Sequence, residues 1–451
     1  MSRDSDEETD LIENVNEIIE NLSRELQDMY LYRDMFFENH AIKMAPEKNK
    51  LVEEKKEELV KKFQKIDVDK QVPFSSRANF LYLKGRCYNI NPVYDARATQ
   101  CLSKAVKLNP HLVDAWNELG ECYWKNMNVK EAKASFEGAL KHERNRISLR
   151  CLSIILRQEN EDRAPKDTTT AILKSVELAK EAVAQDIKDG VSWTVLGNAY
   201  LCQFFMVSQD PAVLKSCLSA YKQAWSDPVA KGQPDLYYNK GIALKYEEQY
   251  SEALRNFEYA CELDPTWEPP RDELGRLTTY LSCTNHLVQS KGKMKVKKLM
   301  QMVQGIDNKM LGIYSPGTFH IFGTRRDVTL ERVTLNSLQE GTNEGKLVLA
   351  KVVGSIHNGN AVPFTFAVVD ESMDCVCITV YNWADGRGAI IGDSVCIPEP
   401  KLAIQKYESK TLKYEFKCIR LNSPMHLLLN GKRLSRDQFA RTKATSTYEI
   451  H

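Results

Sequence analysis

Two oppositely charged side chains, Arg157 and Asp235, are the residues of this chain best suited to specific chemistry, and that chemistry is non-covalent recognition. Arg157 ends the apolar segment Leu-Ser-Ile-Ile-Leu-Arg, and Asp235 follows a proline in Gln-Pro-Asp-Leu. A guanidinium and a carboxylate both form charge-assisted, often bidentate hydrogen bonds. The pair therefore suits an extended peptide that carries one acidic and one basic side chain. The alternative is that both side chains are solvated or form ion pairs with their neighbours.

Motifs for covalent catalysis do not occur in this sequence. The segment Gly341-Thr-Asn-Glu-Gly-Lys-Leu resembles a phosphate-binding loop, but it has one spacer residue too few and lacks the Ser or Thr that would hold magnesium. No H-E-x-x-H, G-x-S-x-G or dinucleotide fingerprint is present, and the histidines are far apart in the sequence. We therefore predict that the protein is not an enzyme and has no cofactor, metal site or small-molecule substrate.

A dense cationic run lies between Ser290 and Met300, where eight residues contain five lysines: Lys291, Lys293, Lys295, Lys297 and Lys298. Such a run could contact a phosphate backbone, act as a nuclear-localisation signal or form a solvated linker. The pattern does not choose among these three interpretations.

The whole chain has 451 residues, a net charge of +1 and a pI near 7.5. This length predicts two or three domains, and the balanced charge argues against a generally nucleic-acid-binding protein. The acidic start has no apolar signal-peptide core, and no stretch approaches the ~18 apolar residues that cross a bilayer. The 12 cysteines are scattered, which suits reduced, buried thiols. We expect a soluble intracellular protein without a membrane partner.

The charged residues lie within a series of helical repeats. The segment from Val113 to Arg144 has Trp116, Gly120, Ala132 and Phe136 at the spacing of a tetratricopeptide (TPR) repeat, a helix–turn–helix unit of about 34 residues. Four other units follow the same frame, beginning near residues 78, 149, 190 and 234. The third unit is degenerate, with a polar insertion at 158–170 that we expect to form a loop. Because one unit cannot bury its apolar face alone, the units must stack and leave a concave surface that binds other chains.

In TPR proteins the first helix of each unit lines this concave groove. The positions that face the groove in that family correspond here to Arg157, Asn198, Asp235, Tyr238 and Tyr246, among others. We therefore expect Arg157 and Asp235 to lie on different repeats of a groove of mixed charge.

Flanking segments complete the predicted organisation. Residues 1–70 form an acidic helical pair packed on the solenoid, and residues 71–290 hold the repeats and a helix, 267–289, that caps them. Residues 291–316 form a lysine-rich linker, 317–440 a small all-β domain, and 441–451 a disordered tail. Seven strands are expected at 328–335, 346–356, 364–370, 376–381, 394–398, 414–421 and 426–429.

Short strands with a Gly-Asp step before a Val-rich strand favour a small barrel of the OB type, so the expected fold is an α-solenoid of TPR helix pairs followed by an OB-fold-like barrel. OB barrels often bind single strands through aromatic side chains on a basic face. Here the aromatic residues are few and several alternate as buried residues do. Packing or protein docking is therefore the favoured role of the barrel, with nucleic-acid binding as the alternative.

The order of these parts resembles the tetratricopeptide repeat protein 5 family across nearly the whole chain. Ala-Trp116-Asn-Glu-Leu-Gly-Glu, Leu-Gly-Asn198-Ala-Tyr and Lys-Tyr246-Glu-Glu-Gln-Tyr carry the resemblance in the repeats, and Val-Pro363-Phe-Thr-Phe and Ile-Gly392-Asp-Ser-Val-Cys-Ile-Pro-Glu-Pro carry it in the barrel. The resemblance implies a non-catalytic adaptor for tubulin autoregulation. Such an adaptor recognises the N-terminal Met-Arg-Glu segment of nascent tubulin at the ribosome and, with an mRNA-decay recruitment factor, triggers decay of the tubulin message.

The resemblance also implies roles for individual residues. Arg157 and Asp235 match the family's peptide-binding residues, so Arg157 would pair with the peptide's Glu and Asp235 with its Arg. A second acidic contact falls near Glu268, within Trp-Glu-Pro-Pro where the family has Trp-Pro-Glu-Pro. The family's ribosome-facing lysines, which contact rRNA, match the run from Lys291 to Lys298, with Val296 in place of a proline.

A second hypothesis follows from the same resemblance. The family is linked to p53 and p300 transcriptional coactivation in a stress and DNA-damage response in the nucleus, and to an actin-nucleating cofactor in the cytoplasm. The chain would then be a transcriptional cofactor scaffold whose barrel contacts chromatin or nucleic acid. Ribosome binding that depends on the lysine run favours the first hypothesis, and salt-sensitive DNA binding by the barrel favours the second.

Overall fold

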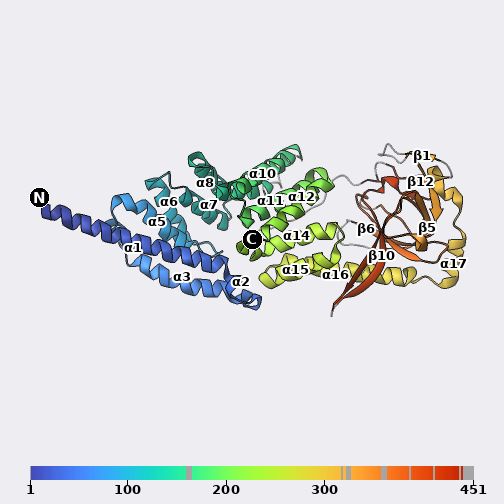
Figure 1. Ribbon diagram of the computed structural model, residues 1–451, viewed down its shortest axis with the longest axis horizontal. Helices are drawn as coiled ribbons and strands as arrows, with labels where there is room; N and C mark the ends of the chain where they lie inside the picture. Colours follow the sequence, from blue (N-terminus) through green and yellow to red (C-terminus); the bar gives the residue numbers. More distant parts are fainter. Residues whose placement is uncertain are drawn as a thin grey trace. The chain divides into compact units, whose positions relative to one another are not determined.

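The structure, a computed structural model, describes residues 2–158, 165–315, 318–320, 327–356, 363–384, 387–409, 412–435 and 438–439 (Figure 1). The chain divides into two compact units. The helical unit comprises Met1–Glu247 with Asn256–Pro270, and the barrel unit comprises Glu248–Arg255 with Arg271–Thr445.

The helical unit is a stack of antiparallel helix pairs, which confirms the predicted TPR solenoid (Figure 1). Its first pair is α1 (Ser2–Asp34) and α3 (Lys48–Gln64), with the short α2 (Phe36–Asn39), η1 (Ile42–Glu47) and α4 (Val68–Gln71) beside them. The repeats that follow are α5 (Phe74–Tyr88) with α6 (Ala96–Leu108), α7 (Val113–Lys125) with α8 (Val129–His142), α9 (Arg146–Gln158) with α10 (Pro165–Gln185), α11 (Gly190–Gln203) with α12 (Pro211–Ala224), and α14 (Pro234–Tyr246) with α15 (Tyr250–Leu263). The short α13 (Pro228–Lys231) joins the last two repeats.

Glycines let the two helices of a repeat approach closely, because an aromatic ring occupies the space where a side chain would stand. A Cβ atom added at Gly120 would lie 2.7 Å from the ring of Phe136, and one at Gly197 would lie 2.4 Å from the ring of Tyr221. The same arrangement recurs at Gly241, 2.6 Å from Phe257. This recurring glycine–aromatic contact is the physical reason that the repeat frame could be read from the sequence.

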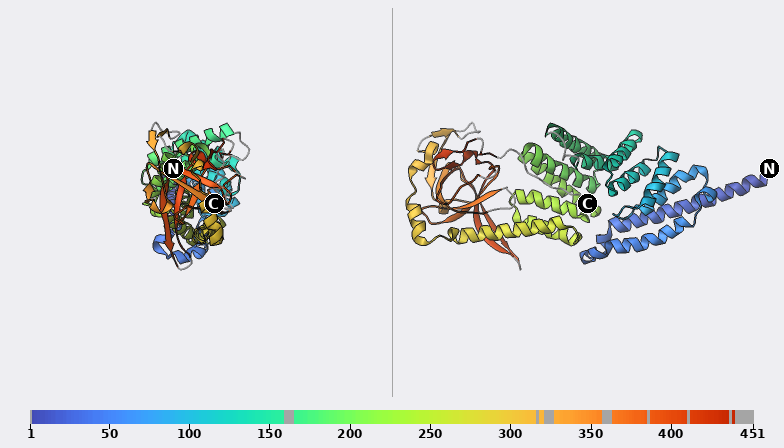
Figure 2. Two further views of the ribbon diagram at one scale, coloured as in Figure 1. Left: turned by 90° about the vertical axis from the view of Figure 1, so that its right-hand side faces the viewer. Right: turned by 180° about the vertical axis from the view of Figure 1, so that it is seen from behind.

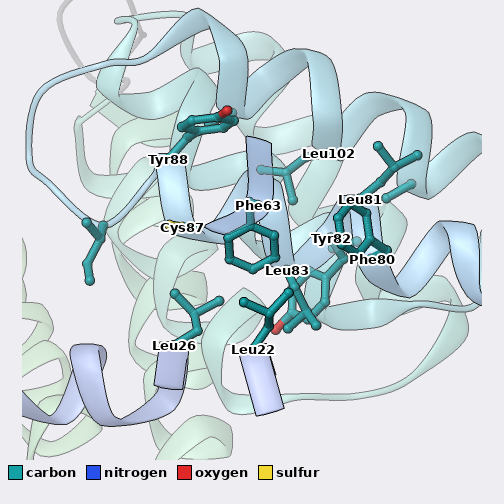
Figure 3. Close-up of a cluster of buried hydrophobic side chains, with 14 of the residues drawn as sticks. Leu22, Leu26, Phe63, Phe80, Leu81, Tyr82, Leu83, Cys87, Tyr88 and Leu102 are labelled. Carbon is teal, nitrogen blue, oxygen red and sulfur yellow. The ribbon is translucent and has the colours of Figure 1, made fainter. Parts of the chain in front are cut away.

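The N-terminal helix pair packs on the first repeat, as predicted. Figure 3 shows Leu22 and Leu26 of α1 and Phe63 of α3 directed toward the side chains of α5. The rings of Phe63 and Phe80 meet with their centroids 5.7 Å apart. Burial of these apolar side chains, each stabilising by about 1.5–3 kcal/mol, holds the pair on the solenoid.

Two details of the repeats differ from expectation. In the third repeat α10 already begins at Pro165, so a helix occupies the C-terminal part of the expected loop, while residues 159–164 lie outside the described residues. In the fourth repeat α11 continues into a π-helical turn, η2 (Phe204–Ser208), which ends at Gln209 with φ of 50°. The helix–turn–helix pattern of a TPR unit does not predict this π-helical turn.

The barrel unit contains a sheet of ten strands: β3 (Glu331–Val333), β4 (Gly341–Thr342), β5 (Lys346–Ile356), β6 (Phe364–Val369), β7 (Cys375–Val380), β8 (Ser394–Pro398), β9 (Lys401–Glu408), β10 (Lys413–Leu421), β11 (Leu428–Leu429) and β12 (Lys432–Arg433). A separate two-stranded sheet pairs β1 (Thr318–His320) with β2 (Asp327–Thr329). Figure 2 shows the strands of the larger sheet, in orange and red, wound into a barrel.

The strand pairing explains how the sheet closes. β5, β6 and β7 form an antiparallel meander, β7 pairs in parallel with β10, and β10 pairs with β9. β8 pairs with β5 at the other side of the path, and only Glu399 and Pro400 separate β8 from β9. This two-residue bend, with φ of 44° at Glu399, carries the chain from β8 on one side of the strand path to β9 on the other. The predicted OB-type barrel is confirmed, whereas β9 was missed because its side chains are largely polar.

Two predicted domain boundaries were wrong. Residues 291–316 were expected as a linker, but they contain η3 (Lys291–Lys293), α17 (Val296–Gln304) and η4 (Asn308–Tyr314). Leu299 and Val303 of α17 are buried, and Tyr314 of η4 packs in a cluster with Leu347 and Leu349 of β5. The expected capping helix is α16 (Glu268–Gln289), which from Arg271 onward belongs to the barrel unit. The tail 441–451 lies outside the described residues.

Candidate peptide-binding site

The groove-facing helices of the first two repeats hold a polar network whose members bind one another. Tyr30 of α1 donates a hydrogen bond to the carbonyl of Arg86 (3.0 Å), and the Arg86 guanidinium lies 3.3 Å from the carboxylate of Glu118. Lys125 contacts Glu121 at 2.8 Å and donates to the Asn89 carbonyl at 2.6 Å. Since these charges are used within the fold, this part of the groove is poorly suited to a charged ligand.

Burial changes the acidity of two carboxyl groups in this network. Burial and the neighbouring charge of Glu121 raise the pKa of Glu118 to about 7. Burial acts in the same direction on Glu121, but the charges of Lys125, Arg33 and Arg150 outweigh it and hold the pKa of Glu121 below its ordinary value. The network therefore carries a proton that is released near neutral pH.

Arg157 lies in the last turn of α9 and is only 9% exposed. Its guanidinium donates to the hydroxyl of Ser153 (2.8 Å), and that hydroxyl donates to the Ser175 carbonyl on α10 (2.8 Å). On the other side, burial raises the pKa of the Cys202 thiol to about 11, and the nearby charge of Arg157 opposes that rise. Arg157 is therefore held by Ser153 between α9 and α10, and its charge is near enough to affect Cys202 of α11.

Asp235 lies in the first turn of α14 and is half-buried. Burial raises the pKa of its carboxyl, while hydrogen bonds from the Asn198 side chain and from the backbone N–H groups of Leu236 and Asp235 oppose the rise. Tyr221 donates to the amide oxygen of Asn198 (2.8 Å), so the amide nitrogen is the group left to donate to Asp235. Asp235 is thus a desolvated carboxylate with a fixed orientation.

One turn of α11 therefore separates a positive and a negative side chain. Asn198, which binds Asp235, and Cys202, which lies beside Arg157, are four residues apart, or about 6 Å along a helix. Neighbouring residues of an extended peptide are about 3.3 Å apart and direct their side chains to opposite faces, so long side chains on two neighbours can reach groups about 6 Å apart. The arrangement suits a peptide in which a basic and an acidic residue are neighbours, since Arg157 and Asp235 both interact with residues of α11.

The other predicted peptide contacts have different surroundings. Tyr238 is 7% exposed, and its ring packs 5.0 Å from Trp267 and 6.0 Å from Phe257, which makes it a packing residue. Tyr246 is half-buried, 4.9 Å from the ring of Phe204 in η2. Glu268 is exposed in the first turn of α16.

Sequence reasoning missed three residues that shape this site. Ser153 and Tyr221 were not singled out in the sequence, yet they hold Arg157 and Asn198. Asn239 lies one turn after Asp235 on α14, a spacing that could have drawn attention to it. No pattern indicates that its amide is buried, because burial depends on the contacts between helices.

The five lysines of the run differ in their exposure. Lys291 is half-buried and donates to the Met373 carbonyl (2.8 Å), so it stabilises the barrel unit. Gly292, with φ of 70°, lies so close to β5 that an added Cβ would meet the Val353 carbonyl oxygen at 2.2 Å. The remaining lysines are exposed and form what we call the lysine patch: Lys293, Lys295, Lys297 and Lys298. The patch is carried on a turn and helix fixed to the barrel, beside the exposed Val296.

The barrel face that usually binds oligonucleotides in OB folds is covered in this unit. That face is formed by the second and third barrel strands, here β6 and β7. Thr365 of β6 lies 3.0 Å from the hydroxyl of Tyr280 in α16, and Thr379 and Tyr381 donate to the carboxylate of Glu248 at 2.7 and 3.1 Å. All of these side chains are buried. The predicted alternative of nucleic-acid binding gains no support from this face.

In the part of the chain that the structure describes, no three His, Cys, Asp or Glu side chains gather as metal ligands. None of the described helices is both long and apolar enough to cross a bilayer.

Comparisons with known proteins agree with this architecture. The tetratricopeptide repeat protein 5 OB fold domain family matches residues 329–443, and two tetratricopeptide repeat families match residues 113–145 and 234–267. Tetratricopeptide repeat protein 5 from Bos taurus, Homo sapiens and Mus musculus is 40% identical over 421 residues, 93% of this chain and 94% of each relative. Among solved structures, the Cut9–Hcn1 complex of APC/C aligns with a TM-score of 0.40 and 14% identity, covering 49% of this chain and 40% of that chain.

Proposed function

The chain belongs to the tetratricopeptide repeat protein 5 family, and on that premise we propose that it is a non-catalytic adaptor that reads a peptide in its TPR groove. One observation carries the proposal. A buried guanidinium, Arg157, and a desolvated carboxylate, Asp235, lie beside positions one helical turn apart on α11. Both side chains are held in place by hydrogen bonds, so little conformational entropy is lost when a ligand binds.

The ligand that we propose is the N-terminal Met-Arg-Glu segment of nascent tubulin. Its neighbouring Arg and Glu supply the basic and acidic side chains that the two groove charges would bind, with the peptide's Arg at Asp235 and its Glu at Arg157. The lysine patch would then contact rRNA, because four exposed lysines held on one turn and helix suit a phosphate backbone. A recruitment factor bound to the adaptor would start decay of the tubulin message.

Peptide binding tests the proposal directly. We expect Asp235→Asn and Arg157→Gln each to weaken binding of a tubulin N-terminal peptide by about 1.5–3 kcal/mol, the scale of a charge-assisted hydrogen bond. Glu137→Gln, which neutralises an exposed carboxylate on α8, is the matched control and should bind normally. A peptide with Arg and Glu exchanged should bind poorly to the wild type. Wild-type affinity in both groove variants would exclude this site.

The alternative function is a nuclear cofactor scaffold in the p53 and p300 pathway, and a family member with this role would occur in both nucleus and cytoplasm. Its nucleic-acid contact would need a surface other than the covered face of β6 and β7. DNA binding by the full chain that survives neutralisation of the lysine patch, and that weakens with salt, would favour this alternative.

A further inference from the structure

Asn239 is a polar residue that the interactions described so far do not explain. It is 2% exposed, in the second turn of α14, and its amide oxygen has no hydrogen-bond partner among the described residues. Buried acceptors without a donor are uncommon in folded proteins, because the lost interaction with water is not replaced. An apolar residue of similar size would stabilise the helix contact more. Asn239 therefore lowers the stability of the fold, which indicates that it has a role other than packing.

The place of Asn239 relative to Asp235 suggests its use. The two residues are four apart on α14, so their side chains lie on one face, about 6 Å apart along the helix axis. Asp235 is directed toward α11 by its bond with Asn198. The carboxylate and the unpaired amide oxygen therefore form two acceptors in a row along this side of α14.

Two acceptors in a row distinguish the two basic side chains of proteins. A guanidinium is planar and carries five N–H donors in a fixed fork, so it can bind a carboxylate with one edge and a further acceptor with another. An ammonium is compact, with three donors on one nitrogen, so it reaches acceptors from two side chains one helical turn apart less well than a planar fork does. A site with Asp235 alone would accept either cation.

We propose that Asp235 and Asn239 form a slot for a guanidinium, in which Asn239 makes the groove select arginine over lysine. The inference rests on the proposed function, since it concerns the same groove, and it adds the residue that decides which basic side chain is accepted beside Asp235. The guanidinium donates to the Asp235 carboxylate and to the Asn239 amide oxygen. Asn198 is a positioning residue that keeps Asp235 aligned with the slot.

The test compares two acetylated synthetic peptides, one with Arg and one with Lys beside the same glutamate, by calorimetry on the full chain. We expect the wild type to bind the Arg peptide at least tenfold more tightly. In Asn239→Leu, which removes the acceptor and keeps the volume, binding of the Arg peptide should fall about tenfold, while binding of the Lys peptide should stay within twofold. Thermal unfolding should show that this variant is at least as stable as the wild type.

Further variants separate this inference from the proposed function. Asp235→Asn should weaken binding of both peptides by about tenfold or more, and if it does not, the proposed groove function itself fails. If Asp235→Asn weakens both peptides in this way but Asn239→Leu leaves the Arg-to-Lys ratio unchanged, or weakens both peptides equally, the slot is overturned while the groove stands. Asn239→Ser, which is smaller and keeps a hydroxyl, provides the same comparison should the leucine variant fail to fold.

Discussion

The hydroxyl of Tyr221 on α12 donates a hydrogen bond to the amide oxygen of Asn198 on α11, over 2.8 Å. Both residues are buried, and the bond decides which end of the Asn198 amide faces Asp235. The second helix of the fourth repeat thus controls a side chain in the groove without touching the groove itself. The same ring fills the space above Gly197, so one residue both packs the repeat and orients the site.

Removing that hydroxyl should weaken peptide binding without breaking the repeat. In Tyr221→Phe the ring still packs against Gly197, but the Asn198 amide loses the bond that fixes its orientation. We expect peptide affinity to fall by about 0.5–1.5 kcal/mol, the net value of a typical hydrogen bond. Calorimetric titration measures this change, and circular dichroism should show unchanged helix content. An affinity equal to that of the wild type would show that Asn198 is oriented by other contacts.

Peptide affinity should depend on pH through Asp235. Burial raises the pKa of this carboxyl above its ordinary value in the free protein, and a bound cation lowers it again. The charged form is therefore needed for binding, and affinity should fall as pH drops from 7 through the raised pKa. Titrations between pH 5 and 7.5 check this, with Asp235→Asn as the control, whose weak binding should not change over that range.

The charged Asp235 carboxyl should lower the stability of the fold at neutral pH. A group whose pKa is raised on folding contributes stability below its unfolded pKa, and this contribution is lost as pH rises through the folded pKa. Asp235→Asn should therefore unfold at a higher temperature than the wild type at pH 7, and the difference should shrink at pH 4. A variant that binds less and is more stable is the result expected at a binding site; lower stability at pH 7 would contradict it.

Glu118 should also lower the stability of the fold at neutral pH, and by more than Asp235 does. Its pKa is raised to about 7, compared with 4.5 for an ordinary glutamate. Between pH 4 and pH 9 the wild type should lose about 2–3 kcal/mol of unfolding free energy relative to Glu118→Gln, since each pKa unit corresponds to about 1.4 kcal/mol. Urea unfolding at both pH values measures the difference. A constant difference would mean that Glu118 titrates as it does in the unfolded chain.

The lysine patch should contribute a salt-dependent part of ribosome binding. Lys297→Gln combined with Lys298→Gln should reduce the slope of log affinity against log salt by about 1.4–1.8, because each phosphate contact contributes about 0.7–0.9. Co-sedimentation over a salt series gives this slope. The matched control is Lys61→Gln with Lys65→Gln, two exposed lysines in and just after α3, which should leave the slope unchanged. Equal slopes in all three proteins would remove the patch from ribosome binding.

Much of the fold was predictable from local patterns. Glycines such as Gly120 recur at one position in three repeats because an aromatic ring must pass there, so the spacing of the sequence records the helix contact. The barrel strands β5 and β8 were predicted with their correct bounds because Gly and Asp turns separate runs of apolar residues. The strand β9 was missed because alternating polar residues on an exposed ribbon resemble a loop. The segment 291–316 was read as a linker because its few buried residues, such as Leu299, are hidden among lysines.

The candidate site shows where sequence reasoning ends. The repeat frame alone placed Arg157 and Asp235 on groove-facing helices, because helical periodicity determines which face a residue occupies. Only the tertiary structure decided that Ser153 holds Arg157, that Tyr221 orients Asn198, and that Asn239 is buried without a donor. The bond from Tyr221 to Asn198 joins two helices, and the burial of the Ser153–Arg157 pair and of Asn239 arises from packing between helices. Periodicity within one helix does not record such contacts, so chemistry that depends on desolvation becomes visible only in the folded chain.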